Sequence, residues 1–328
     1  MLLHPAYSLF YMSLMTSILI TMSANSWFMA WLGLEMNLMS FVPLIINKKN
    51  KYSVESALKY FLVQAVASTF FIVFSSMQAY SQSSLTIPIA VLMVKAAAAP
   101  CHQWLPAVVD GMSWPLTAIL TTLQKMNPLT MIFFIMKTNL ILSLLYFFIF
   151  MSALVGAIGG LTQISMRKIM AYSAIAHLSW MLSTLLLNSW AWLVYFIMYA
   201  IILVSLIMLL NLSQLFYLNQ LFTINKSYLS FLISASILSM GGLPPFSGFL
   251  PKLMTMTLLS NSPHNFVLIF LLSSSFISLF FYMRFILTTL MLASSSSSAP
   301  FKKLKMNFKL LHMNLIMLLA PSLSLVLM

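Results

Sequence analysis

Two lysines near the middle of consecutive apolar segments are the residues best suited to chemistry in this sequence. Lys95 lies ten residues into the segment LTIPIAVLMVKAAAAPCHQWLP, and Lys125 lies at the centre of a segment from about 114 to 136. Segments of this length and composition are expected to cross a lipid bilayer, with both ammonium groups deep in the hydrocarbon. Each charge there costs at least about 2.5 to 3.5 kcal/mol on insertion scales. Because two neighbouring segments carry this cost, we predict that both lysines are functional.

Glu35 and His177 fall in the same layer as Lys95 and Lys125. At about 1.5 Å per residue, all four lie roughly 15 to 18 Å from the positively charged ends of their predicted helices. Scattered structural charges have no reason to share one depth. Ionisable groups in a low dielectric exchange protons readily because burial disfavours their charged forms, and histidine can relay a proton through either ring nitrogen. The pattern therefore predicts a proton path near the bilayer midplane.

Other ionisable residues near the membrane each have a functional and a structural interpretation. Lys59 lies closer to the positive surface, where snorkelling toward lipid headgroups is the alternative. His102 follows a proline break, and Lys252 is expected on the opposite half of the membrane, at the proton exit. Glu35 could instead pair with a lysine for assembly, and His177 could hydrogen-bond a neighbouring helix. The remaining charged residues are expected to be a membrane anchor, Arg284, and two solvated loop residues, Glu55 and Asp110.

Composition places the chain among polytopic membrane proteins. Of 328 residues, 62% are hydrophobic and 6% are charged,. The net charge of +13 lies mostly in short loops, where it sets orientation, so no nucleic-acid partner is expected. A single cysteine, Cys101, excludes an iron–sulfur cluster held by this chain alone,, and the histidines are poorly placed for paired haems. We expect no cofactor and no metal here, and no cleavable presequence before the first apolar segment.

Apolar segments long enough to cross about 30 Å of hydrocarbon predict an all-α polytopic membrane protein. Eleven transmembrane helices are expected, at about 3–22, 27–46, 54–78, 85–107, 113–136, 140–163, 167–187, 190–213, 227–257, 264–291 and 308–327. The motif GGLPPFSGF makes the ninth either a hairpin or one broken helix. The broken helix keeps ten lysines and arginines on one side against Lys137 on the other, whereas a hairpin gives six against five,. We therefore expect a broken helix, with the amino terminus on the positive side and the carboxyl terminus opposite.

The fourth and ninth predicted helices are both interrupted, and both carry a lysine. Lys95 is followed by Pro100, and two prolines precede Lys252. Prolines are common in membrane helices in general. Because the two helices are five apart, however, the sets that contain them cross the membrane in opposite senses, the pattern of an inverted repeat. We expect one transmembrane domain that consists of repeat one at about 3–137, repeat two at about 140–291 and a final helix at about 308–327.

Six stretches between positions 31 and 252 resemble the antiporter-like, proton-pumping subunits of respiratory complex I, the NADH:ubiquinone oxidoreductase. They are WLGLEMNLMSFVPLI, ESALKYFLVQAVAS, KAAAAPCHQWLPAVVDG, LTTLQKMNPL, QISMRKIMAYSAIAHLSWM and GGLPPFSGFLPKL, in that order. The methionine-rich composition and the absence of a presequence resemble the form encoded in animal mitochondrial DNA. Eleven helices resemble the animal form, which lacks the first three of the fourteen in bacterial relatives.

The resemblance implies two inverted five-helix bundles, each with a discontinuous helix, and a specific proton path. A glutamate–lysine pair modulates a central lysine, which passes its proton laterally through water and a histidine toward two further lysines for release on the far side. The residues that match these roles, together with a second channel histidine, are Glu35, Lys59, Lys95, Lys125, His177, Lys252 and His102. The sequence departs from the family pattern at Cys101 and at Pro251.

The resemblance also implies a location and partners. It places the chain in the mitochondrial inner membrane, with the amino terminus on the matrix side and the carboxyl terminus on the intermembrane-space side. Expected partners are other membrane-arm subunits, accessory subunits and phospholipids such as cardiolipin, with all redox chemistry in partner subunits. Two alternatives stay open, a cation/proton antiporter subunit and a passive membrane scaffold. Selectivity for sodium or potassium would require more intramembrane carboxylates than Glu35 alone.

Overall fold

The protein is described from a computed structural model that covers residues 5–47, 50–76, 85–136, 139–187, 190–218, 220, 227–244 and 246–293. Within these ranges the regular elements are helices, accompanied by one isolated antiparallel bridge between Ser165 and Tyr217. The chain divides into two compact units, Met1–Ser152 and Ala153–Met328. Each unit is described by itself below.

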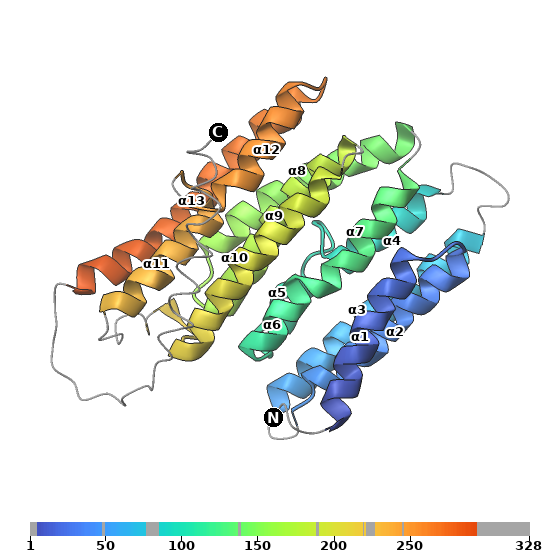
Figure 1. The fold of residues 1–328 in the computed structure, drawn as a ribbon, viewed down its shortest axis with the longest axis horizontal. Helices are drawn as coiled ribbons and strands as arrows, with labels where there is room; N and C mark the ends of the chain where they lie inside the picture. Colours follow the sequence, from blue (N-terminus) through green and yellow to red (C-terminus); the bar gives the residue numbers. More distant parts are fainter. Residues whose placement is uncertain are drawn as a thin grey trace. The chain divides into compact units, whose positions relative to one another are not determined.

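The first unit contains seven helical segments and the start of an eighth in its described residues. These are α1 (Pro5–Met22), α2 (Trp27–Ile45), α3 (Lys51–Ser76), α4 (Thr86–Ala96), α5 (Trp104–Asp110), α6 (Trp114–Thr121), α7 (Leu123–Ile135) and α8 (Asn139–Leu161), which continues into the second unit (Figure 1). Helix α2 packs against α1 and α3, and α3 in turn packs against α4 and α5. Helix α7 packs against both α4 and α1. This packing brings the early helices of the unit against α7, which carries Lys125.

In the second unit, α9 is the buried centre. The helices that follow α8 are α9 (Met166–Leu186), α10 (Ala191–Ser213), α11 (Ser227–Gly241), α12 (Phe249–Ser260) and α13 (Asn265–Ala293). Helix α9 packs against α10, α12 and α13, and 89% of its most apolar 18-residue window is buried. Its serines satisfy their hydroxyls on carbonyls of the same helix, as in Ser173 to Met170 and Ser183 to Trp180. A helix with polar side chains can therefore lie in an apolar interior.

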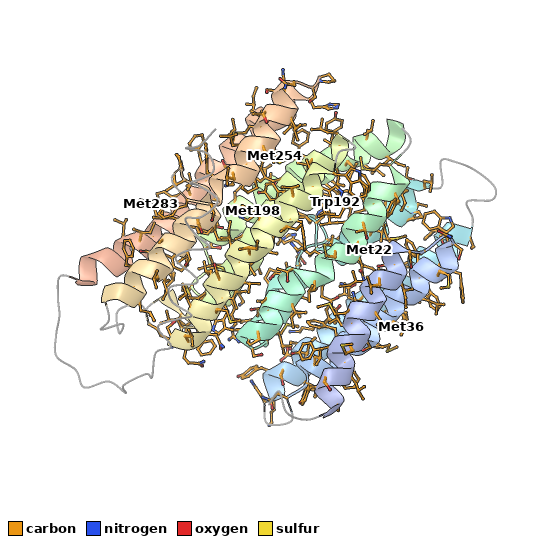
Figure 2. All side chains as sticks on the ribbon, in the orientation of Figure 1. Met22, Met36, Trp192, Met198, Met254 and Met283 are labelled. Carbon is orange, nitrogen blue, oxygen red and sulfur yellow. The ribbon has the colours of Figure 1, made fainter. Side chains whose placement is uncertain are left out.

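Six helices within the described residues, α2, α3, α8, α9, α10 and α13, are long and apolar enough to cross a membrane. Large apolar side chains project from the helices throughout (Figure 2). Met36 on α2 and Met283 on α13, both labelled there, are more than two-fifths exposed. Exposed apolar side chains on so many helices are typical of surfaces that face lipid or neighbouring membrane helices.

The expected bounds of the unbroken helices agree with those of α1, α2, α3, α8, α9, α10 and α13 to within three residues. The fifth expected helix, 113–136, differs because it is interrupted at Thr122 between α6 and α7. The Thr122 hydroxyl and backbone N–H both donate to the carbonyl of Ala118, at 2.6 and 3.0 Å. A residue further along, Pro128, lacks the N–H that would bond the carbonyl of Gln124. The non-helical backbone of Thr122, with φ −114° and ψ −83°, and the bond missing at Pro128 interrupt regular helix on either side of Lys125,.

The fourth and ninth expected helices are broken, as predicted. Helix α4 ends at Ala97, which has a left-handed conformation with φ 61°. Helices α11 and α12 follow one another in nearly the same direction, with the long helix α13 packed against both (Figure 1). The ninth segment is therefore a broken helix rather than a hairpin. The expected helix 308–327, Lys137 and most of the loop lysines used to predict orientation lie outside the described residues.

Candidate functional site

Lys95 and Lys125 line one cavity inside the first unit. Lys95 lies in the last turn of α4 and is 7% exposed, and Lys125 lies in the first turn of α7 and is 2% exposed. Inside the cavity, the centre of a sphere the size of a water molecule can occupy a volume of about 20 Å³. One water molecule needs about 10 to 15 Å³ of such space. The two lysines expected to exchange a proton thus border a space large enough for a bridging water.

A chain of uncharged hydrogen-bonding side chains forms part of the cavity wall. The Tyr60 hydroxyl donates to Oε1 of Gln124 at 3.0 Å, and Nε2 of Gln124 donates to Oδ1 of Asn37 at 2.9 Å. Next to this chain, the Thr21 hydroxyl donates to Oδ1 of Asn127, also at 3.0 Å. These bonds tie α1, α2 and α3 to α7. Because each partner is fixed, the wall presents amide and phenol groups in set orientations.

Sequence reasoning did not select these wall residues, although a signal for them was present. Gln124 and Asn127 flank Lys125 within the run LTTLQKMNPL, and Asn37 follows Glu35 by two residues. Amide side chains within apolar membrane segments need hydrogen-bonding partners. Their closeness in sequence to candidate ionisable residues could have placed them in the same site.

Glu35 belongs to the surroundings of Lys95, and Lys59 makes its direct ion pair with a different carboxylate. The Glu35 carboxylate is half-buried on α2 and interacts electrostatically with Lys95. Its Oε2 atom is buried and has no hydrogen-bond partner among the residues that the structure describes. Lys59 instead lies 2.6 Å from Oε1 of Glu55 in an exposed ion pair on α3. Side chains on a helix lean toward its amino terminus, which directs Lys59 toward the preceding turn and Glu55.

Two residues expected in loops are helical. Glu55 lies within α3 rather than before it, because α3 begins at Lys51, and Asp110 is the last residue of α5. His102 lies in the break between α4 and α5, where its Nδ1 is 3.1 Å from the carbonyl oxygen of Pro100. The ring of His102 is half-buried. It is thus held by the backbone of the break.

In the second unit, His177 on α9 faces two tyrosines of α10. Its Nδ1 and the Tyr195 hydroxyl lie 2.9 Å apart, within hydrogen-bonding distance. The ring of Tyr199 is centred 5.0 Å from the imidazole ring, and its buried hydroxyl makes no hydrogen bond within the described part of the chain. Both tyrosines are almost fully buried. The imidazole is therefore oriented through one nitrogen, and the tyrosines are further residues that sequence reasoning did not select.

Lys252 lies in the first turn of α12, just after the break, and is 5% exposed. Its Nζ donates to the carbonyl of Gly241, the last residue of α11, at 2.7 Å. The next residue, Gly242, has φ +77°, a conformation that favours glycine,. A Cβ atom on Gly242 would lie 2.7 Å from Cδ of Lys252. The break and the lysine are therefore packed as one structure.

Arg284 on α13 forms a hydrogen bond with the backbone of α8. Its Nη2 atom donates to the carbonyl of Gly160 near the end of α8, at 3.1 Å. A cation near the carboxyl end of a helix interacts favourably with its carbonyl dipoles. Arg284 thus joins α13 to α8, and its role as a membrane anchor stays a prediction.

The structure groups the predicted residues into two sets. The first unit holds Lys95 and Lys125 at one cavity with Glu35 acting on Lys95, and it leaves Lys59 on the surface. The second unit holds His177 and Lys252 on α9 and α12, which are in contact. A common depth for these groups across both units stays a prediction.

Comparisons with known proteins identify a family and a fold that this chain resembles. The sequence profile of the family described as "NADH:quinone oxidoreductase/Mrp antiporter, TM" matches residues 24–278. NADH-ubiquinone oxidoreductase chain 2 of Anopheles gambiae is 38% identical over 286 residues, which cover 84% of this chain and 83% of the relative. The protein of the same name from Aedes aegypti shows the same identity and coverage. Among solved structures, a chain of respiratory complex I from Thermus thermophilus superposes with a TM-score of 0.83 at 21% identity, over 98% of this chain and 78% of that one.

Proposed function

The chain belongs to the NADH:quinone oxidoreductase/Mrp antiporter family of membrane proteins, and from this premise we propose that it is a proton-translocating subunit in the membrane arm of respiratory complex I. Its relatives at 38% identity carry the name chain 2 of NADH-ubiquinone oxidoreductase. One observation carries the proposal at the level of mechanism. Lys95 and Lys125, on different helices, border one cavity with room for water. Two buried cations at one cavity are costly unless protons move between them.

In the proposed first step, the proton passes between Lys95 and Lys125 across the cavity. An ammonium at one lysine donates to water, and the neutral amine of the other accepts, so that one charge is present where two would repel. Glu35 is proposed to act on Lys95 through the attraction between opposite charges,. Any movement that weakens this attraction sends the proton on to Lys125. The uncharged wall formed by Tyr60, Gln124 and Asn37 does not trap the proton.

The second unit is proposed to carry the proton onward to the far side. His177 can accept a proton at one ring nitrogen while the other faces Tyr195,. Lys252, buried at the α11–α12 break, is proposed as the last protein group before release, and His102 as an access group at the α4 break. Lys59, exposed and paired with Glu55, is proposed to modulate Lys95 only indirectly, through the neighbouring helices.

We place the chain in the mitochondrial inner membrane, with its amino terminus in the matrix and its carboxyl terminus on the intermembrane-space side. The support for this orientation is the asymmetric distribution of loop lysines and arginines,. Other membrane-arm and accessory subunits and phospholipids such as cardiolipin are the proposed partners. Reduction of the quinone is assigned to partner subunits, and this chain contributes proton transfer alone.

The alternative of cation/proton exchange, suggested by the antiporter part of the family, is disfavoured by the cavity's chemistry. A sodium ion is bound by oxygen ligands, usually including carboxylates, whereas the cavity lining combines amides and a phenol with two lysines. The ammonium groups would repel a second cation. We expect that vesicles containing the assembled complex take up protons at a rate that does not depend on the sodium concentration. The concentration is varied from about 1 to about 100 mM, and the upper limit approaches physiological ionic strength.

Replacement of Lys125 by methionine tests the proposed function. Lys125→Met keeps the volume of the side chain and removes its titratable amine. In the assembled complex, reconstituted into vesicles, we expect normal subunit composition and a lower number of protons moved per NADH oxidised. The matched control is Lys51→Met, at an exposed lysine in the first turn of α3, which should leave this ratio unchanged.

The same measurement separates pumping from a scaffold role. If Lys125→Met assembles fully and moves as many protons per NADH as the unaltered complex, Lys125 has no part in translocation. If it prevents assembly, Lys125→Gln, which retains a polar group, is expected to restore assembly but not pumping. Restoration of both by glutamine would also reject the proposal.

A further inference from the structure

The Lys252 ammonium is held by the open carbonyl end of a half-helix. Helix α11 ends at Gly241, where carbonyl groups are left without partners from the same helix,. The Gly242 N–H donates hydrogen bonds to the carbonyls of Leu238 and Ser239. The carbonyl of Gly241 receives Nζ of Lys252 at 2.7 Å. The lysine thus reaches back from α12 to the negative end of the α11 dipole.

An indole ring faces the same ammonium from a different helix. Nζ of Lys252 lies 5.8 Å from the centre of the Trp180 ring, within the range of a cation–π interaction. Trp180, on α9, is 3% exposed, so water does not screen the contact. The protonated amine is therefore enclosed by a carbonyl on one side and the face of an aromatic ring on another.

No carboxylate is available to Lys252 from its own unit. Residues 153–328 contain neither aspartate nor glutamate. Helices α9, α10 and α13 pack against α12, and none of their ionisable side chains is negative at neutral pH. These side chains are Arg167, Lys168, Tyr172, His177, Tyr195, Tyr199, Tyr282 and Arg284. Within this unit the ammonium depends on uncharged groups for its stabilisation.

We infer that Trp180 is a positioning residue for proton transfer, and that its ring and the Gly241 carbonyl together form a binding site for the protonated side chain of Lys252. The inference rests on the proposed function and assigns a role to a residue outside the ionisable path. Loss of the proton weakens both contacts at once, because each is strong only toward a cation. The neutral side chain is then released from the break, while reprotonation draws it back.

The position of Trp180 also links the site to His177. The two residues are three apart on α9 and therefore neighbours on its surface. His177 contacts α10 through Tyr195, and Trp180 contacts α12 through Lys252. A displacement of this segment of α9 moves the imidazole and the indole together. Through α9, the arrival of a proton at His177 can therefore affect the contact between Trp180 and Lys252.

The test compares Trp180→Phe and Trp180→Leu in the assembled complex reconstituted into vesicles. Proton pumping and NADH oxidation are measured from pH 6 to about 9. This range includes the ordinary pKa of histidine and ends below the ordinary pKa of lysine. We expect the pH at which pumping is half lost to move downward by about one unit in Trp180→Leu, a tenfold change in the protonation equilibrium. Trp180→Phe, which keeps a weaker π face, should show a smaller shift. Trp190→Leu, at a 63% exposed tryptophan, is the control and should show none.

Each outcome decides the inference. Unchanged pH profiles for both Trp180 variants overturn it, as does an equal loss of pumping at every pH, which indicates a structural role only. If Trp180→Leu fails to assemble, the Trp180→Phe profile decides in the same way. In a Lys252→Met background, Trp180→Phe should have no additional effect on pumping. Normal pumping by Lys252→Met itself would reject the function proposed for that lysine, which is a different result from an unshifted Trp180 profile.

Discussion

Each of the two broken helices carries a buried lysine next to its break, but the two lysines lie on different sides of their breaks in the sequence. Lys95 precedes its break and lies in the last turn of α4, whereas Lys252 follows its break and reaches back to Gly241 from α12. The first lysine has an electrostatic partner in the Glu35 carboxylate, whereas the unit that holds the second contains no aspartate or glutamate. The electrostatic requirement of a buried lysine can thus be met either by a counter-charge or by dipoles and an aromatic ring.

The breaks also differ in backbone. Residues 97–103 of the first contain no glycine, and Ala97 itself has the left-handed conformation. The second break contains Gly242, with positive φ, and Gly248, which approaches the backbone of α11 closely. Substitution of the glycines in the second break is therefore expected to destabilise the protein. In the first break, replacing Ala97 by glycine is expected to relieve backbone strain.

Gly248→Ala should have the largest effect of the changes that test this difference. A Cβ atom at Gly248 would lie 1.6 Å from the carbonyl oxygen of Ser239, so backbone must move. We expect a loss of about 3 kcal/mol or more in stability and little assembled complex on native gels. Gly241→Ala is the matched control, because its Cβ would lie 2.8 Å from the flexible end of Leu279 and in ordinary contact with the Tyr282 ring, at 3.4 Å, rather than against backbone. Equal assembly of both variants would contradict the close approach.

Gly242→Ala should be the next most severe change. The new methyl group adds left-handed strain of about 1 to 2 kcal/mol and crowds the Lys252 side chain. We expect a thermal midpoint lowered by several degrees in the detergent-solubilised complex, together with reduced pumping. Normal pumping at reduced stability would show that the position of Lys252 does not depend on this glycine.

Glu35→Gln removes the counter-charge that distinguishes the first break. Without this counter-charge the ammonium of Lys95 loses a favourable electrostatic interaction, so we expect fewer protons moved per NADH oxidised in vesicles that contain the assembled complex. Glu55→Gln is the control because its ion pair with Lys59 is exposed and exposed pairs contribute little. A similar loss in both variants would remove the distinction between the two carboxylates.

Tyr60→Phe tests whether the cavity wall of the first unit is held by its hydrogen bonds. The change leaves Oε1 of Gln124 buried without its phenol donor, at a cost of about 1 to 2 kcal/mol. The thermal midpoint of the complex should fall, and Tyr195→Phe gives the corresponding measurement beside His177 in the second unit. An unchanged midpoint for Tyr60→Phe would indicate that the wall is held by packing alone.

Ala97→Gly should have the smallest effect, and it should be stabilising. Glycine adopts the left-handed conformation of Ala97 without the steric cost of a Cβ atom,. The greater flexibility of the unfolded chain offsets part of this gain, which leaves an expected increase of at most about 1 kcal/mol in stability. A lower thermal midpoint would show that the Ala97 methyl group contributes packing that outweighs its strain.

The amino-acid sequence by itself determined the helical class, the bounds of the unbroken helices and the choice of ionisable residues. These follow from local chemistry, because long apolar segments form helices and a charge within one is conspicuous. The breaks after Lys95 and before Lys252 were predictable for the same reason, since proline interrupts the hydrogen bonds of a helix. The interruption at Thr122 was missed because threonine gives a much weaker signal, through a side-chain bond to the carbonyl of Ala118.

Only the tertiary structure decided which side chains meet. It paired Lys59 with Glu55 rather than Glu35, joined Gln124 to Tyr60 and placed Trp180 over Lys252. Sequence patterns give the face of a helix but not the rotation of its neighbour, and a cation–π contact or an amide hydrogen bond depends on ångström distances between helices far apart in the chain. The identity of the charged residues is therefore a property of the sequence, while their partners are a property of the packing.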